Sequence, residues 1–265
     1  MKKIFSVLGL IFMSGAAVFA QHIEYDEYTL DKGLHVILQQ DNSAPVVTTA
    51  VMYHVGAKDE NPDRTGFAHF FEHLLFEGTE NIARGQWDKI MGANGGSGNA
   101  NTTDDRTYYY ETFPSNNLQL ALWMESERMF HPVINQIGVD TQREVVKEEK
   151  RMRMDNAPYG RLWESIKSNL FKKHPYRWAP IGSMEHLNAA TLDEFKAFFK
   201  KFYLPSNAVL VIAGDFDKEQ TKKWINEYFA TIPSGPRPAK NQYVEDLITT
   251  QINAVTEDPN IQLPM

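Results

Sequence analysis

The sequence predicts an α+β fold, a mixed, mostly antiparallel sheet with helices packed on one face. Runs of β-branched residues open the sequence, and apolar residues spaced as on amphipathic helices fill its middle. One more strand and one more helix follow. Strands and helices that come in separate blocks, rather than in regular alternation, are typical of α+β proteins.

The composition excludes several classes of protein. The chain has 265 residues, of which 42% are hydrophobic and 23% charged, which is ordinary for a globular protein and excludes disordered and collagen-like chains. It contains no cysteine, so disulfides, thiolate metal ligands and a cysteine nucleophile are excluded. The formal charge of −7 becomes −9 (−7 − 2) without Lys2 and Lys3. Backbone phosphates repel such a chain, so no nucleic-acid partner is expected.

Residues 1–20 are predicted to form a secretory signal peptide. Lys2 and Lys3 precede an uncharged apolar run, and small residues end at Ala20, so cleavage is expected before Gln21. The alternative is a membrane anchor, but the apolar run is shorter than the roughly 20 residues of a spanning helix. Gly and Ser also interrupt it. We therefore expect an exported protein, in the bacterial periplasm or secreted, without a stable membrane anchor.

The folded part is expected to begin with strands. The segment "YTLDKGLHVILQQ" has two extended runs around a Lys-Gly turn, and "PVVTTAVMYHVGA" is β-branched, which together predict a β-meander. The spacing then changes to that of an amphipathic helix over residues 65–76. Its apolar side consists of Phe67, Phe70, Phe71, Leu74 and Leu75.

Further elements follow in order. After a short helix over 85–94, two strands are predicted over 95–103, opened by glycines, and 106–113, rich in tyrosine. Thr191 is the expected N-cap of a later helix that Pro205 stops. The remaining predicted elements are helices over 117–130, 140–155, 159–171 and 191–203, a buried strand over 207–217 and a helix over 218–232.

The predicted domain covers residues 21–232. From Pro233 the sequence changes to "PSGPRPAKNQ", which is typical of a Pro-rich linker. The residues after it are too few for a domain. Residues 233–265 are therefore expected to be a linker and the truncated start of a second domain.

The segment "HFFEH" carries the chemistry. On a helix, His69, Glu72 and His73 lie opposite the apolar side, and the segment from Gly66 to Phe76 has no Lys, Arg or Asp, which a solvated face usually carries. Two histidines at i and i+4 can bind one Zn²⁺. Glu72 is then placed to take a proton from a water on that metal. The order His-x-x-Glu-His is the inverse of the commoner zinc-protease motif and is itself a catalytic signature.

A catalytic zinc needs a third protein ligand. The segment "DTQREVVKEEKRMRMD" offers several carboxylates, and Glu144 and Glu148 share a face with Arg151, as in a solvated ion-pair strip. Glu149 has Val145, Val146 and Met152 as helical neighbours, which favours it over Glu148 as a carboxylate directed at the core.

Five segments together resemble the pitrilysin and insulin-degrading-enzyme family, which includes the mitochondrial processing peptidases. In chain order between Tyr28 and Pro233, they are "HFFEH", "GNANTTDDRTYYYETFP", "REVVKEE", "HPYRWAPIGSMEHL" and "FYLPSNAVLVIAGDF". The resemblance implies a zinc metallopeptidase with His69, His73 and Glu149 as ligands of one Zn²⁺ and Glu72 as general base. It also assigns Asn99 and Ala100 to an edge strand that binds an extended peptide through its main chain. Without the resemblance, "GGSGNAN" is more simply a flexible Gly-rich turn.

One position departs from the family pattern. Many relatives have a supporting glutamate seven residues before the third ligand, whereas this chain has the uncharged Gln142 there. Loss of such a supporting group often costs about 10- to 100-fold in metal affinity or activity. The sequence therefore predicts weaker support of the metal site at this position.

The expected function is zinc-dependent hydrolysis of extended peptides or unfolded polypeptides, with Glu72 as base. The alternative is a non-catalytic peptide-binding or assembly subunit, and a serine hydrolase is disfavoured because Gly-x-Ser-x-Gly does not occur. The resemblance also implies a further domain of the same fold, in the chain or in a partner. We expect a truncated chain, or one half of a two-chain enzyme, that is inactive without that second half.

Overall fold

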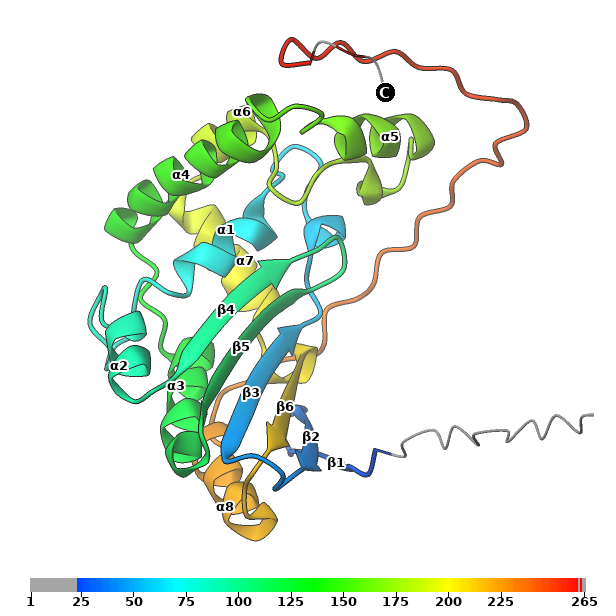
Figure 1. Ribbon diagram of the computed structural model, residues 1–265. Coiled ribbons are helices and arrows are strands. Elements are labelled where there is room, and N and C mark those ends of the chain that lie inside the picture. The colour runs from blue at the N-terminus through cyan, green and yellow to red at the C-terminus, as the bar shows by residue number, and fades with distance from the viewer. Residues whose placement is uncertain (1–22, 262, 264–265) are drawn as a thin grey trace, which may run out of the picture.

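The computed structural model describes residues 23–261 and residue 263 (Figure 1). The predicted signal peptide, residues 1–20, lies outside the described residues. In the described part, no helix combines the length and the apolar character that crossing a membrane requires.

The sheet has six strands in the order β1-β2-β6-β3-β5-β4. Strands β2 and β6 pair in parallel, and the other neighbours pair antiparallel. The predicted mixed, mostly antiparallel sheet is confirmed. The strands are β1 Asp26–Thr29, β2 His35–Gln40, β3 Val46–Tyr53, β4 Ser97–Thr102, β5 Thr107–Pro114 and β6 Ala208–Gly214.

The expected β-meander is wrong after its first hairpin. Strands β1 and β2 pair as expected around Gly33, whose positive φ of 91° suits glycine. However, β6 lies between β2 and β3 and pairs with both. An apolar strand such as "AVLVIAG" is more stable inside a sheet, where both edges are hydrogen-bonded and its side chains are covered. Local alternation reveals a strand but does not reveal its neighbours.

The predicted helices are all present, and α6 was not predicted. Helix α4 begins before the predicted Asp140 because the Asn135 Oδ1 accepts a hydrogen bond of 2.9 Å from the Gly138 N–H. A π-helical turn, Arg151–Asp155, follows α4. The helices are α1 Phe67–Leu74, α2 Trp87–Ala93, α3 Leu118–Phe130, α4 Gln136–Lys150, α5 Leu162–Leu170, α6 Met184–Ala189, α7 Leu192–Phe202 and α8 Lys218–Phe229.

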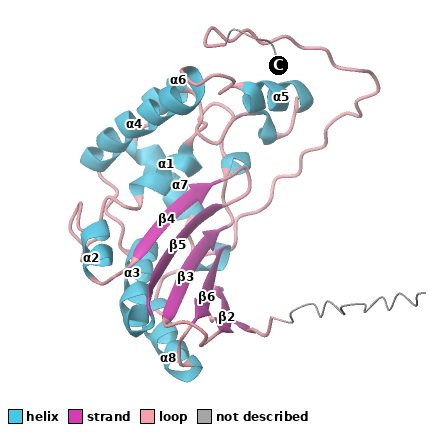
Figure 2. Cartoon of the chain, viewed as in Figure 1, coloured by secondary structure: helices cyan, strands magenta, loops and turns pink. Residues whose placement is uncertain are grey.

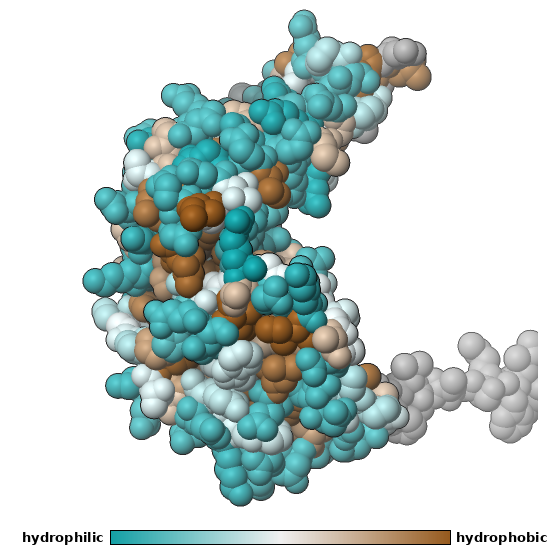
Figure 3. All heavy atoms as spheres, turned by 90° about the vertical axis from the view of Figure 1, so that its left-hand side faces the viewer, coloured by the Kyte–Doolittle hydropathy of each residue, from teal (hydrophilic) through white to brown (hydrophobic). Residues whose placement is uncertain are grey.

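Helices cover one face of the sheet, as predicted, and leave the other open (Figure 2). Along β5 every second residue is buried, and the residues between them are half-buried. Helix α3 packs against β3 and β5 on the covered face, with α8 beside it. The side view in Figure 3 has a hollow on its right, the side on which Figure 1 shows β3, β4 and β5 uncovered.

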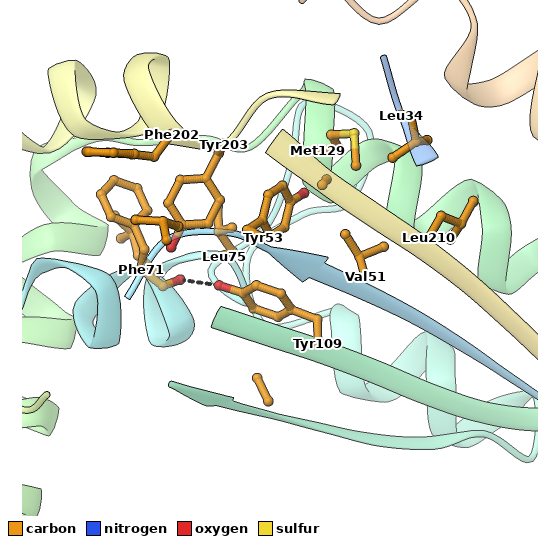
Figure 4. Packing of buried hydrophobic residues seen from close by; sticks show 14 of the residues in the cluster. Leu34, Val51, Tyr53, Phe71, Leu75, Tyr109, Met129, Phe202, Tyr203 and Leu210 are labelled. Carbon is orange, nitrogen blue, oxygen red and sulfur yellow. Dashed lines mark hydrogen bonds between the residues drawn. The ribbon is translucent and has the colours of Figure 1, made fainter. Parts of the chain in front are cut away.

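The core joins α1 to α7 and to the sheet through aromatic rings. Phe71 of α1 lies between Phe198 and Tyr203, with ring centroids 5.6 and 5.0 Å away. The Tyr109 hydroxyl of β5 donates a hydrogen bond of 2.9 Å to the Phe71 carbonyl oxygen (Figure 4). Helix α1 is therefore held rigidly on the sheet by its apolar side, as its spacing predicted.

A charged cluster is buried between β5 and α3. Arg128 is fully buried and donates a hydrogen bond of 2.8 Å to Glu111, and a second carboxylate, Glu125, lies 3.3 Å away. The guanidinium also lies 4.1 Å from the centre of the Trp87 ring. Burial raises the pKa of Glu125 to about 8. Its neutral form is therefore favoured at pH 7, which leaves one carboxylate to balance one cation.

Replacing Arg128 with methionine is expected to destabilise the fold by about 3–5 kcal/mol, because it leaves the buried Glu111 carboxylate without its cation. Urea unfolding of both proteins measures the difference. Arg151→Met is the control, since Arg151 forms a solvent-exposed pair with Glu148 and its loss should change the free energy of unfolding by less than about 0.5 kcal/mol. Equal destabilisation by the two variants would contradict a structural role for the Arg128 cluster.

Beyond the last helix, residues 233–261 contain no helix or strand in the described structure. This segment includes the predicted Pro-rich linker. The assignment of residues 233–265 to a linker and a truncated second domain stays a prediction.

Candidate metal centre

Helix α1, which carries the His-x-x-Glu-His motif, is fixed at its first turn by hydrogen bonds and along its apolar side by the core. The Glu60 carboxylate is buried and accepts hydrogen bonds of 2.9 Å from the Gly66 and Ala68 N–H groups at the first turn. Gly66 has a φ of 96°, and a Cβ there would lie 2.8 Å from the Ile181 carbonyl oxygen. With the phenylalanines of α1 in the core, the opposite side of the helix carries His69, Glu72 and His73.

Three candidate ligands converge from two helices. His69 and His73 of α1 and Glu149 of α4 have ligand atoms that all lie within 4.8 Å of one another. The Glu149 Oε2 atom lies 3.5 Å from the His69 Nε2 and 3.1 Å from the His73 Nε2. The other oxygen of Glu149 pairs with Arg153 of the π-helical turn at 2.9 Å. The structure thus brings together the three residues that the sequence selected.

This arrangement fits a zinc ion. With bonds of roughly 2.0–2.1 Å, neighbouring ligand atoms of a tetrahedral Zn²⁺ lie about 3.3 Å apart. The two measured separations, 3.1 and 3.5 Å, bracket that value. Two imidazoles and one carboxylate form a donor set found at catalytic zinc sites, where water or substrate takes the fourth position.

The electrostatics favour the protonation states that bind metal. Burial, with a smaller contribution from His73, lowers the pKa of His69 to about 4, so its ring is neutral at pH 7. A hydrogen bond with His73 lowers the pKa of Glu149, which stays ionised. Because metal ligands must be deprotonated, neither of these residues has to lose a proton at pH 7 before it can bind.

Glu72 lies beside the three ligands without belonging to them. Burial raises the pKa of its carboxyl group, and the nearby Thr102 hydroxyl partly opposes this effect. Its Oε2 atom is buried and has no hydrogen-bond partner among the described residues. Glu72 and His73 line a cleft of about 310 Å³ together with Phe76, Asp88, Gly98 and Asn99. Glu72 therefore faces a space in which a reacting group can sit.

The far wall of this cleft is the sheet edge formed by β4. Among the described strands, β4 pairs only with β5, so its other side is free. The segment from Ser97 to Thr102 is a strand, so the simpler expectation of a flexible Gly-rich turn is wrong. The Asn99 Oδ1 accepts a hydrogen bond of 2.8 Å from the Ala100 N–H. That N–H is thus bonded to a side chain rather than to β5.

The other carboxylates of α4 lie away from the site. Glu148 pairs with Arg151 and Glu144 with Lys147, each at 2.9 Å on the exposed side of α4, as expected for an ion-pair strip. The apolar surroundings that favoured Glu149 over Glu148 in the sequence are only partly confirmed. Val146 is buried, but the other two predicted apolar neighbours, Val145 and Met152, are 44% and 66% exposed.

Gln142 contacts Glu77, beyond the end of α1, rather than a ligand. Its Nε2 donates a hydrogen bond of 2.5 Å to Glu77, which also pairs with Arg84. Its Oε1 is buried and has no partner among the described residues. The predicted weakening of the metal site at Gln142 stays a prediction.

Sequence reasoning missed Asp88 and Gly98 in the cleft. Sequence reasoning also assigned no role to Phe76. Asp88 opens a short helix and carries no signal of its own, because an acid in the first turn of a helix is ordinary. A larger cleft of about 800 Å³ lies between α5 and residues 252–261 and 263, and none of the predicted site residues lines it. The smaller cleft is the one beside the candidate ligands.

Comparison with known families identifies the chain. Residues 35–180 match the model of the insulinase family, peptidase family M16, and this range contains His69, Glu72, His73 and Glu149. The chain belongs to the insulinase family. Residues 189–264 match a second model, described as the inactive domain of family M16 peptidases. Helices α7 and α8 and strand β6 lie in that second range, although β6 is part of the same sheet.

Insulinase-family relatives are zinc proteases by name. The chain is 33% identical over 240 residues to the zinc protease PqqE of Helicobacter pylori. This match covers 87% of this chain and 54% of PqqE. It is 30% identical over 211 residues to an uncharacterized zinc protease of Mycobacterium tuberculosis, with 79% of this chain and 48% of that protein covered. The chain thus spans about half the length of the curated relatives it matches.

Solved structures agree with this membership. A protease from Helicobacter pylori has a TM-score of 0.79 and 31% identity, with 83% of this chain and 53% of that chain covered. The ferredoxin protease FusC, solved in complex with Arabidopsis ferredoxin, has a TM-score of 0.77 and 25% identity, with 83% of this chain and 25% of that chain covered. In both cases the present chain matches part of a longer protease.

Proposed function

We propose that this chain carries the zinc centre of an exported metalloendopeptidase that cleaves extended peptides or unfolded polypeptides. The observation that carries the proposal is the convergence of His69, His73 and Glu149 beside Glu72 and a free sheet edge. The names of the relatives support zinc and proteolysis. Export rests on the N-terminal sequence alone.

Each residue of the site has a proposed task. A zinc ion bound by the three ligands would acidify a water molecule and polarise the scissile carbonyl. Glu72, raised in pKa and directed into the cleft, accepts a proton from the attacking water and delivers it to the leaving amine.

The free edge of β4 is proposed to hold the substrate. An extended peptide can add to this edge through main-chain hydrogen bonds, which give affinity without selecting a sequence. The Ala100 N–H, now bonded to the Asn99 side chain at 2.8 Å, is a donor for a substrate carbonyl. Asn99 is exposed and can then turn to another substrate main-chain group.

A second half is proposed to complete the enzyme. The curated relatives are about twice as long as their match to this chain. The cleft beside the ligands is open, and a substrate held from one side only is poorly positioned, where misplacement by about 1 Å can cost 100-fold in rate. A further domain, in the same polypeptide or in a partner, would supply the opposing wall. We further propose that the first domain ends near Pro233, where the linker to this second half begins.

The test is zinc content and chelator-sensitive cleavage. We expect one zinc ion per chain by elemental analysis and hydrolysis of a mixture of unfolded peptides that a chelator abolishes and added zinc restores. The assay is run on the chain alone and with a separately made second half from a longer relative, and cleavage is expected only, or far faster, in the mixture.

Two results would change this assignment. Cleavage that survives complete removal of the metal would overturn the zinc mechanism. Zinc and peptide binding without cleavage in either arrangement would favour the non-catalytic peptide-binding subunit instead.

A further inference from the structure

The cleft beside Glu72 is also lined by an acidic residue from a third element. Its walls come from α1 (Glu72 and His73), from Phe76 just beyond that helix, from β4 (Gly98 and Asn99) and from α2 (Asp88). Both acidic residues in this lining face the same space, and His73 is its only basic residue. A substrate side chain that enters here meets a negative potential.

Asp88 lies on a fixed helix, and its side chain pairs with no residue that the structure describes. Its neighbours in α2, Trp87 and Met91, are 1% and 7% exposed, and the Trp87 indole N–H donates a hydrogen bond of 2.8 Å to Glu111. The Asp88 side chain is exposed, and it forms no ion pair or hydrogen bond with any residue that the structure describes. Its carboxylate is therefore presented to the cleft by a fixed helix and is free to pair with a ligand.

The neighbouring wall suits a long aliphatic stem. The Phe76 ring lines the cleft and is fixed from behind by Trp87, Tyr109 and Arg128, at 6.2, 6.0 and 4.5 Å from its centre. Lysine and arginine lay their methylene groups along such apolar surfaces and extend the charge beyond them. Phe76 and Asp88 together therefore match a basic side chain better than a short or acidic one.

The strand direction places this subsite after the scissile bond. A peptide that continues the antiparallel pattern of β3, β5 and β4 runs from the Thr102 end of β4 toward Gly98. Glu72 lies near Thr102, and Asp88 lies near Gly98 and Asn99. The substrate residue that reaches Asp88 is thus C-terminal to the scissile bond, at which Glu72 acts as the base.

We propose that Asp88 selects lysine or arginine at a substrate position that follows the cleaved bond. This inference rests on the proposed function and adds a specificity-determining residue to it. A solvent-accessible ion pair gives a preference of about fivefold at most, and it weakens as the salt concentration rises.

The test compares otherwise identical peptides with Lys, Gln or Glu placed in turn at successive positions after the cleaved bond. The full chain, together with its second half where that is needed for activity, cleaves them in competition, and mass spectrometry gives the ratios of kcat/KM. We expect Lys to be preferred over Gln by up to about fivefold, Asp88→Asn to bring that ratio near one, and Asp88→Lys to favour Glu. Glu80→Gln, which removes an exposed acid outside the cleft, should leave the ratio unchanged.

A binding measurement separates this inference from the proposed function. In the Glu72→Gln chain, fluorescence anisotropy of labelled peptides should show tighter binding of the Lys peptide than of the Gln peptide, and Asp88→Asn should remove the difference. If no cleavage occurs, the proposed function fails while this binding difference still supports Asp88. An unchanged Lys-to-Gln ratio in Asp88→Asn, in cleavage or in binding, overturns the assignment of Asp88.

Discussion

Glu72→Gln is expected to lower the rate of peptide cleavage by about 100- to 10,000-fold, the contribution typical of a positioned general base. The amide has the shape of the carboxylate but cannot accept a proton from water. Glu72 is not among the three converging ligands, so the variant should still bind one zinc ion. The measurements are kcat/KM on an unfolded peptide and zinc content of the same sample.

The matched control for Glu72→Gln is Glu148→Gln. Glu148 lies on the exposed side of α4 and pairs with Arg151, so the control should keep both cleavage and zinc. Loss of zinc from Glu72→Gln would mean that the roles of base and ligand must be exchanged. Full activity in Glu72→Gln would mean that another group takes the proton.

Glu149→Gln is expected to weaken zinc binding by more than about 100-fold, beyond the effect of removing a residue that merely supports a ligand. Glu149 is the only carboxylate in the converging set, and its Oε2 lies within 3.5 Å of both imidazoles. Without its charge, two neutral imidazoles remain, which hold zinc poorly. Competition with a chromogenic chelator measures the affinity.

Glu148→Gln again serves as the comparison, because the two glutamates are adjacent on α4 but point to different surroundings. Thermal unfolding in the presence of chelator checks that both variants fold equally well without metal. Equal zinc affinity in the two variants would remove Glu149 from the site and reopen the choice of third ligand.

Much of the fold follows from local patterns. The apolar spacing of α1 and the alternation of β5 were readable because 3.6 and 2 residue periods are properties of a single segment. The same alternation places Glu111 on the covered face with Tyr109 and Phe113. Its buried partner Arg128 was not predicted, because the pairing depends on how α3 lies across the sheet.

The order of the strands could not be predicted in this way. Strand β6 comes late in the sequence but lies between β2 and β3. Its pairing with both of them joins segments more than 150 residues apart, as in the pairing of Tyr53 with Ala208. Such pairing depends on which edges are free when the strand forms, and alternation of side chains does not contain that information.

By itself the sequence determined the chemistry available on one helix: His69 and His73, four residues apart, necessarily lie on one side of α1 with Glu72 between them. Only the tertiary structure decided what completes the site. Glu149 lies 76 residues beyond His73, and its approach to the imidazoles depends on the crossing of α1 and α4. Asp88 and the free edge of β4 likewise reach the cleft through packing. Periodicity is set within one segment, whereas convergence depends on how separate segments bury their apolar sides together.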